Sequence, residues 1–259
     1  MLRFKNLGSG STGNATVVEG RSGAHVRRLL IDCGFGIRQL QSRLAQANLQ
    51  VDDLDAVFVT HEHSDHIGCA QAVALRYRIP VWMSAGTHAA LGAPDFGDML
   101  RIANDMVPID LGTFEAHPFT VPHDAREPLQ LRCSDGAVHL GVLTDLGHAS
   151  PHVLQQISGC HALLIEANHD SAMLQSSTYP TFLKRRVSGL YGHLRNEITA
   201  DILRSVRNPR LQCVVAAHLS AKNNEPTLVQ TVLAAAMDWP VEAIGIASPT
   251  SGTGWVPVV

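Results

Sequence analysis

The chain has 259 residues, of which 45% are hydrophobic and 17% charged, and its formal net charge is −3. This is the composition of an ordinary globular protein, and it excludes a disordered chain and a uniformly basic nucleic-acid binder. No apolar run is long enough to cross a bilayer, so we expect no membrane partner. The five cysteines form no CxxC pair, which favours reduced thiols and a cytoplasmic protein. No linker interrupts the sequence, and we expect a single domain over residues 1–259.

The predicted elements of the first half are strands interspersed with helices. Apolar and β-branched runs predict strands over Ala15–Val18, Arg28–Ile31, Ala56–Thr60 and Pro80–Met83. Helical spacing of apolar residues predicts helices over Ile37–Ala47 and Ile67–Tyr77. Three strands joined by turns are then expected over Thr113–Val121, Leu129–Cys133 and Val138–Leu143.

The second half has the same texture. Strands are predicted over Ala162–Glu166, Cys213–Ala217 and Val241–Ile246, and helices over Tyr179–Val187, Glu197–Val206 and Pro226–Met237. Strands alternate with helices, but hairpins are also present, so mixed sheets fit better than a purely parallel sheet. The expected fold class is therefore α/β (α+β), as an αββα sandwich of two mixed sheets with helices on the outer faces.

The segment THEHSDH, which begins at Thr60, carries the strongest chemical signal. It follows a predicted strand, and residues two apart in an extended chain point the same way, so His61 and His63 can meet at one ion. Asp65 and His66 come where the chain turns into a helix, and they can face a second ion. Imidazole nitrogen and carboxylate oxygen suit zinc and similar divalent metals. The alternative, a polar loop that happens to be rich in histidine, is weak for four ligands in six residues.

A second feature is the local charge. From Lys184 to Arg210 there are seven basic and two acidic residues, an excess of five positive charges. One interpretation is a solvated surface. The other is a phosphate-binding surface, to which Lys184, Arg185, Arg186 and Arg195 would contribute.

The segment THEHSDHIG resembles the HxHxDH signature of the metallo-β-lactamase superfamily. Three later residues at strand ends, His123, Asp145 and His218, are similar to the remaining ligands of that family. The resemblance implies two divalent metal ions, with zinc first and manganese or iron as alternatives. It also implies a metal-bridging hydroxide as the nucleophile.

The same resemblance implies a division of the ligands between the two ions. His61, His63 and His123 would hold one metal, and Asp65, His66 and His218 would hold the other. Asp145 would bridge them. No GxSxG motif and no phosphate-binding GxxxxGK[ST] loop competes with this interpretation.

Four blocks resemble the YycJ-like (WalJ-like) branch of the superfamily: the opening LGSGSTGN, and EANHD, GHLRNE and HLSAKNNE further on. Alanine at 167 and arginine at 195 replace the serines of many relatives, which puts substrate preference in doubt. The branch is related to RNase Z and to cyclic phosphodiesterases, and its members are described as 5′-to-3′ exonucleases on DNA. The resemblance thus implies a phosphodiesterase or nuclease with a phosphodiester substrate, either DNA or RNA.

The branch motifs also supply catalytic and substrate-binding candidates. Glu166 and His193 resemble the pair that assists cleavage in RNase Z, and we expect them to act with Asp65 in catalysis. A structural hydrogen bond or an extra metal contact is the alternative for this pair. Candidate substrate contacts are Ser9, Ser11, Asn14, Arg195, Asn196 and Asn223.

Two of these blocks have a second interpretation. The glycine-rich opening can be a tight turn between strands, or its NH groups can cradle an oxyanion. Asn223 can instead cap the helix that begins near Pro226.

Other functions remain open at this point. The first is a small-molecule hydrolase of the same fold, such as a cyclic phosphodiesterase, a lactonase or a thioesterase. The second, from another class, is a metal-binding sensor or redox protein. The retained histidines of the signature argue against the redox relatives, which replace one of them. The sequence leaves the oligomeric state open.

Overall fold

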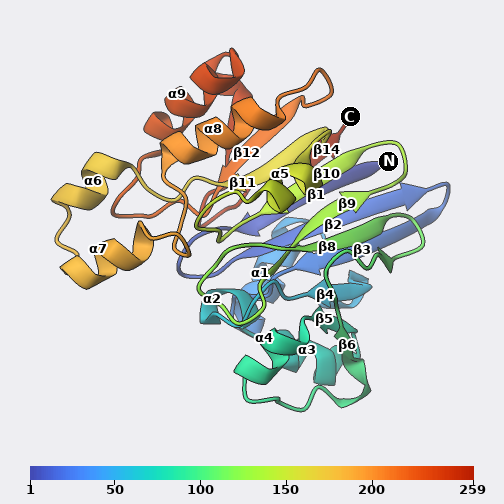
Figure 1. Ribbon diagram of the computed structural model, residues 1–259. Helices are drawn as coiled ribbons and strands as arrows, with labels where there is room; N and C mark the ends of the chain where they lie inside the picture. The colour runs from blue at the N-terminus through green and yellow to red at the C-terminus, as the bar shows by residue number, and fades with distance from the viewer.

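The computed structural model describes all 259 residues and contains two seven-stranded sheets packed face to face (Figure 1). The first sheet has the spatial order β14 (Val256–Val258), β1 (Leu2–Gly8), β2 (Ala15–Ser22), β3 (His25–Ile31), β4 (Ala56–Phe58), β5 (Val81–Met83) and β6 (Leu100–Ile102). The second has the order β13 (Ile244–Ile246), β12 (Cys213–Ala217), β11 (Ala162–Glu166), β10 (His139–Leu143), β9 (Leu129–Ser134), β8 (Glu115–Thr120) and β7 (Ile109–Asp110).

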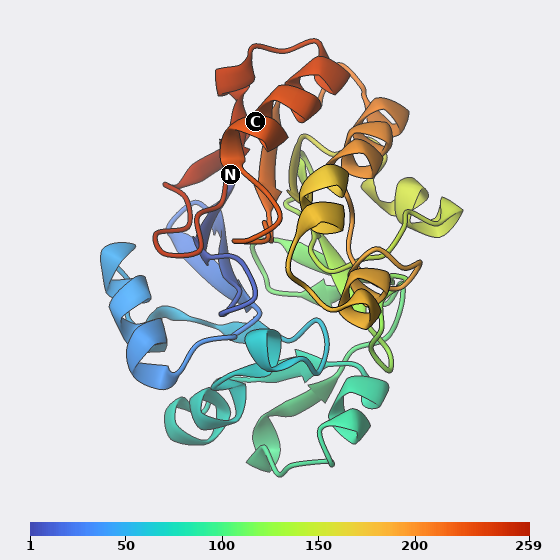
Figure 2. The same cartoon turned by 90° about the vertical axis from the view of Figure 1, so that its left-hand side faces the viewer.

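Both sheets are mixed. Strands β3 to β6 run parallel, as do β10 to β13, and all other neighbours are antiparallel. The predicted αββα sandwich is therefore confirmed. The two chain ends lie side by side, because β14 pairs with β1 (Figure 2).

The core is divided into three layers by the alternation of side chains along each strand. Leu29 and Ile31 of β3 face the second sheet, whereas Leu30 between them packs under the outer helices. The inter-sheet layer also holds Phe58 and Leu164, so both sheets contribute to it. The two outer layers bury the opposite faces of the sheets beneath helices.

The helices cover the outer faces of the two sheets. Those over the first sheet are α1 (Ile37–Gln46) and α3 (Ala70–Tyr77), with α2 (Ser64–Ile67) and α4 (Ala85–Ala90) beside them. Those over the second are α5 (Pro151–Ile157), α8 (Asn196–Val206) and α9 (Pro226–Met237). A further pair, α6 (Ser171–Ser176) and α7 (Thr181–Val187), projects beyond the sheets (Figure 1). No helix is both long enough and apolar enough to span a membrane.

Several elements differ from the prediction. The helix expected over Ile67–Tyr77 begins only at Ala70, and the unpredicted α2 ends before it at Ile67. Gly68 separates the two, because it adopts φ +34° and a Cβ there would lie 2.2 Å from the Cys33 carbonyl oxygen. Strands β1, β6, β7 and β14 and helices α4, α5 and α6 were not predicted. The strand expected over Val241–Ile246 begins with a 3₁₀ turn and becomes extended only at Ile244.

Candidate metal centre

The candidate ligands lie where strands of both sheets end. In the second sheet, β10, β11 and β12 are parallel neighbours, so Asp145, Glu166 and His218 reach the same edge. In the first sheet, β3 and β4 bring Asp32 and His61 to the facing edge. The carboxyl ends of parallel strands are where a mixed sheet collects polar side chains, and here two such edges face each other.

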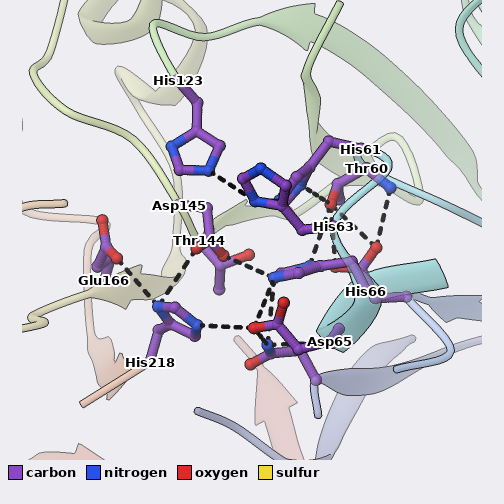
Figure 3. A network of polar contacts seen from close by, with 12 residues as sticks. Thr60, His61, His63, Asp65, His66, His123, Thr144, Asp145, Glu166 and His218 are labelled. Atoms are coloured by element: carbon purple, nitrogen blue, oxygen red, sulfur yellow. Dashed lines mark hydrogen bonds and ion pairs between the residues drawn. The ribbon is translucent and has the colours of Figure 1, made fainter. Parts of the chain in front are cut away.

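Three histidines form one group, which we call the histidine triad: His61, His63 and His123. His61 Nε2 lies 3.0 Å from His63 Nδ1, which in turn lies 3.4 Å from His123 Nε2. The outer nitrogens are engaged elsewhere: His61 Nδ1 is 2.9 Å from the Thr60 hydroxyl, and His123 Nδ1 is 3.1 Å from the Gly192 carbonyl oxygen. The three inward nitrogens therefore converge on one point (Figure 3).

A second group, the aspartate–histidine triad, is formed by Asp65, His66 and His218. Asp65 Oδ2 lies 3.7 Å from His66 Nε2 and 3.6 Å from His218 Nε2. Asp145 lies between the two triads, with Oδ2 3.0 Å from His66 Nε2 (Figure 3). It also forms a group with His61 and His66.

The donor set fits divalent cations. Asp145 Oδ2 and His218 Nε2 are buried, and their contacts with His66 and Asp65 do not have the geometry of hydrogen bonds, which is costly unless something else binds these atoms. The groups that converge are imidazole nitrogens and carboxylate oxygens, the ligands preferred by zinc and other borderline metals. The Asp145 and His218 backbones adopt φ of +59° and +54°, a strained conformation for non-glycine residues that recurs at functional sites.

The pKa shifts of the candidate ligands also favour a bound cation. Burial and the neighbouring His66 hold the pKa of His61 well below its usual range, so its ring is neutral, as coordination requires. Burial alone would lower the pKa of His218, but Asp145 and Asp65 outweigh it and raise that pKa to about 10. The carboxylates therefore draw positive charge to this point, and a cation can replace the proton.

Asp32, which was not among the predicted site residues, supports the first sheet's ligands. It accepts hydrogen bonds from the Thr60 backbone NH at 2.9 Å and from the Thr60 hydroxyl. Its other oxygen lies 2.7 Å from His66 Nδ1. This contact holds a proton on Nδ1, so Nε2 is the nitrogen of His66 that can coordinate once the ring is neutral.

Glu166 has the same role in the second sheet. It is fully buried, and its Oε1 lies 2.7 Å from His193 Nδ1 and 3.1 Å from His218 Nδ1. Its Oε2 accepts the backbone NH groups of Leu146 and Leu194, both at 3.1 Å. Burial would raise the pKa of this carboxyl, but the neighbouring His193 and the side-chain hydrogen bonds with His193 and His218 hold it at about 2. Glu166 is therefore an ionised anchor shared by a candidate ligand and His193.

The glycine-rich opening is a turn that supports the ligand loops. Gly10 NH donates to Asn14 Oδ1 at 2.9 Å, and Asn14 Nδ2 lies 3.4 Å from Asp65 Oδ2. Ser9 Oγ accepts the His218 backbone NH at 2.8 Å. Both side chains are buried, so the structure places them behind the candidate ligands rather than in contact with a substrate.

The other substrate candidates are placed differently. Ser11 and Asn223 line a cavity of about 360 Å³ in front of the candidate ligands. Arg195 lies outside this cavity and lines a neighbouring one, on the far side of His193. Asn196 is fully buried and pairs with Asn224, so it has no surface for a substrate.

Asn223 does not cap the following helix. That helix begins after Glu225 without a side-chain cap, whereas Asn223 Nδ2 donates to Ser220 Oγ.

Several cavity residues escaped the sequence analysis, among them Asn168, Tyr179 and Asp124. Asn168 Nδ2 donates to the His218 carbonyl oxygen at 2.9 Å. Asp124 pairs with Arg186 at 2.6 Å and lies 3.4 Å from His123 Nε2. Asp124 directly follows a predicted ligand, and that position is the only local signal that could have found it.

Comparison with known proteins places this arrangement in a family. A family model described as a beta-lactamase superfamily domain matches residues 27–216. The chain is 33% identical over 234 residues to exodeoxyribonuclease YycJ of Bacillus anthracis, covering 88% of this chain and 86% of that protein. It is 32% identical over 229 residues to exodeoxyribonuclease WalJ of Streptococcus pneumoniae, covering 86% and 83%.

Solved structures agree on the fold. The metallo-beta-lactamase fold protein YhfI from Bacillus subtilis matches with a TM-score of 0.75 at 15% identity, over 98% of both chains. The short form of human tRNase Z matches with a TM-score of 0.65 at 15% identity, over the whole of both chains. This fold implies divalent metal binding through histidine and aspartate ligands. The chain is a metallo-β-lactamase-fold hydrolase that belongs to the beta-lactamase superfamily, and its resemblance to the YycJ and WalJ branch is confirmed.

Proposed function

We propose that the chain is a metal-dependent phosphodiesterase acting on nucleic acid, with DNA as the first candidate substrate. The observation that carries this proposal is the Glu166–His193 pair, whose 2.7 Å contact holds an imidazole beside both ligand triads. A phosphodiester of nucleic acid has an alkoxide leaving group, which needs a proton, whereas hydrolysis of an activated ester does not. The printed names of the YycJ and WalJ relatives support DNA and removal of nucleotides from an end.

In this proposal the histidine triad would hold one divalent ion and the aspartate–histidine triad would hold the other, with Asp145 available to both. Zinc is the first candidate, and manganese or iron are the alternatives. When bound, such a pair supplies Lewis-acid stabilisation and lowers the pKa of water. Asp65 takes part in catalysis as a ligand, held in place by Asn14.

His193 supplies the proton. Its Nδ1 faces Glu166 and lies 3.4 Å from Asp145 Oδ1, so the ring is held from one side while about a quarter of the side chain stays exposed. Its other face borders the cavity in front of the candidate ligands. A proton held at Nε2 can then pass to a leaving oxygen in that cavity, and Glu166 stabilises the ring while it carries the charge.

The test compares two phosphodiesters with His193→Ala. We expect the rate on a DNA oligonucleotide to fall about 10²–10⁴-fold. The rate on bis-p-nitrophenyl phosphate should fall far less, because its leaving group needs no proton. His152→Ala, on α5 and outside the cavity, is the control and should leave both rates intact.

Three results would contradict the proposal. Equal losses on both substrates together with loss of metal would make His193 a ligand. Hydrolysis of a lactone but of neither phosphodiester would make the chain a small-molecule hydrolase. A metal-loaded protein that hydrolyses neither DNA, nor bis-p-nitrophenyl phosphate, nor a lactone would indicate a metal-binding sensor. The cytoplasmic location expected from the sequence stays a prediction.

A further inference from the structure

Two cysteines lie in contact beside the backbone that carries the aspartate–histidine triad. The Sγ atoms of Cys33 and Cys69 are 3.4 Å apart, and no other hydrogen bond in the protein joins two cysteines. Cys33 lies just beyond the end of β3, and Cys69 immediately precedes α3. The two residues are 36 positions apart in the sequence, so the fold brings their thiols together. The proposed hydrolysis gives this pair no role.

The backbone of both cysteines is hydrogen-bonded to the segment that carries two candidate ligands. The Cys33 NH donates to the His66 carbonyl oxygen at 2.8 Å, and the Cys69 NH donates to the Cys33 carbonyl oxygen at 3.1 Å. Asp32, next to Cys33 in the chain, holds the His66 ring through its 2.7 Å contact. A displacement of either cysteine therefore acts on His66 and on the adjacent Asp65.

The backbones at this point are packed too closely to shift independently. A Cβ at Gly34 would lie 1.7 Å from the Asp65 carbonyl oxygen. A Cβ at Gly68 would lie 2.2 Å from the Cys33 carbonyl oxygen. Close-packed interiors transmit strain, so a movement of one segment is passed to the other.

The two thiols differ in their access to solvent. Cys33 is fully buried, whereas Cys69 is 9% exposed. A small oxidant therefore reaches Cys69 more readily, and Cys33 is the thiol in contact with the sulfur that has reacted. An accessible cysteine beside a second, resolving cysteine is the usual arrangement for reversible thiol oxidation.

We propose that Cys33 and Cys69 are a disulfide-forming site that is oxidised by hydrogen peroxide and lowers the metal affinity of the aspartate–histidine triad. The Cys69 sulfur takes one oxygen from the peroxide and becomes a sulfenic acid, and the peroxide leaves as water. The Cys33 sulfur then attacks the sulfenic sulfur, which forms the S–S bond and releases a second water. Two thiols and one peroxide thus give one disulfide and two waters, and a thiol reductant reverses the change.

The bond should disturb one metal site more than the other. The sulfurs must approach from 3.4 Å to about 2.0 Å, which draws Cys69 and the turn before it towards the end of β3. Asp65 and His66 lie on that turn, and misplacing the groups that orient ligands costs about 10- to 100-fold in metal affinity. The inference rests on the ligand assignment of the proposed function, but not on the identity of the substrate.

Thiol counting and mass spectrometry test the bond itself. Zinc-loaded protein is treated with a stoichiometric amount of hydrogen peroxide, and one portion is unfolded and alkylated with N-ethylmaleimide. The five free cysteines should fall to three reactive thiols, because the bond consumes two. The mass before alkylation should be lower by two hydrogen atoms, and peptide mapping should find Cys33 linked to Cys69. Dithiothreitol should restore all five thiols.

Competition with a chromophoric chelator measures the metal affinities before and after oxidation. Oxidation should weaken zinc binding at the aspartate–histidine triad about 10- to 100-fold and leave the histidine triad nearly unchanged. Cys69→Ser and Cys69→Ala remove the reacting thiol, so both variants should bind zinc as the reduced protein does, before and after peroxide. Cys213→Ser removes a half-buried thiol on β12 that has no sulfur partner, and it should respond to peroxide as the wild-type protein does.

The other outcomes each overturn the inference. Oxidation of Cys69 to a sulfinic acid without a disulfide, or a disulfide between two copies of the chain, refutes the pair as a disulfide-forming site. A Cys33–Cys69 disulfide that leaves both zinc affinities unchanged refutes its effect on the triad. In each of these cases, intact zinc binding and phosphodiester cleavage by the reduced protein leave the proposed function standing. A protein that binds no zinc even when reduced refutes the ligand assignment, and both the proposed function and the inference fail.

Discussion

The contact between Asp32 and His66 allows one substitution whose consequence can be worked out atom by atom. In Asp32→Asn, one carboxylate oxygen becomes an amide NH₂. The Thr60 backbone NH is a fixed donor 2.9 Å from Oδ1, so the amide oxygen must occupy that position. The NH₂ group then takes the place of Asp32 Oδ2, which in the wild-type protein lies 2.7 Å from His66 Nδ1. His66 must accept there, which moves its proton to Nε2, the nitrogen that faces Asp65 and Asp145.

The expected loss is specific to one site. A neutral His66 with its proton on Nε2 cannot coordinate, so the aspartate–histidine triad should lose about 10- to 100-fold in metal affinity. This equals about 1.4–2.8 kcal/mol of binding free energy. The histidine triad should keep its affinity. The fold should also persist, because Asp32 has φ +61° and asparagine tolerates that conformation well.

Stepwise competition with a chromophoric chelator measures the two affinities, and ¹⁵N NMR of the imidazole reports which nitrogen of His66 carries the proton. Asp55→Asn is the matched control. Asp55 also accepts two donors, from Arg27 and Arg28, but lies before β4, at the end away from the ligands. Wild-type affinity for both ions in Asp32→Asn, or a His66 that keeps its proton on Nδ1, would refute the reasoning.

Three further predictions follow from the same geometry. The protein should bind close to two equivalents of zinc and release protons as it does so. The raised pKa values of His66 and His218 leave these ligands protonated at neutral pH, so zinc affinity should also rise with pH. A pH-stat titration with zinc, repeated at several pH values, checks the proton release and the pH dependence. Asn14→Ala should weaken that same site about 10-fold or more by chelator competition, whereas Asn6→Ala, a buried control on β1, should lower only the free energy of unfolding. Gly34→Ala should lower the free energy of unfolding by about 3 kcal/mol in urea melts, because its Cβ would lie 1.7 Å from the Asp65 carbonyl oxygen; Gly36→Ala meets no atom within 4 Å and should be near neutral.

The elements that the sequence predicted well are those with uniform apolar runs. Strands such as Ala162–Glu166 and Cys213–Ala217 are buried on both faces, and their bounds agree with the prediction. Strand β1 was missed although its signal was present: Leu2 and Phe4 are fully buried and alternate with charged neighbours. Its pairing with β14, at the other end of the chain, is a contact that local periodicity cannot reveal.

The residues of the candidate site also fall into a group that could be predicted from the sequence and a group that could not. The strand-end pattern predicted the cluster from His61 to His66, and the family resemblance supplied His123, Asp145 and His218; the structure brings all seven candidate ligands together. The supporting residues have no such pattern, because each acts across a long separation: Asn14 contacts Asp65 from 51 positions away, and Ser9 contacts His218 from 209. Asp32 was the exception that could have been found, since it ends an apolar strand as Asp145 does.

The long-range contacts also explain how two sheets can present one site. Asp65 belongs to the first sheet's edge and His218 to the second's, yet both are candidate ligands of the same ion. The turn between β1 and β2 binds both, through Asn14 on one side and Ser9 on the other, and a 3.1 Å hydrogen bond joins these two residues. The relative position of the sheets is therefore fixed at the ligands themselves as well as in the core. A cross-link of this kind keeps the ligand atoms in place before metal binds, which reduces the reorganisation that binding would otherwise require.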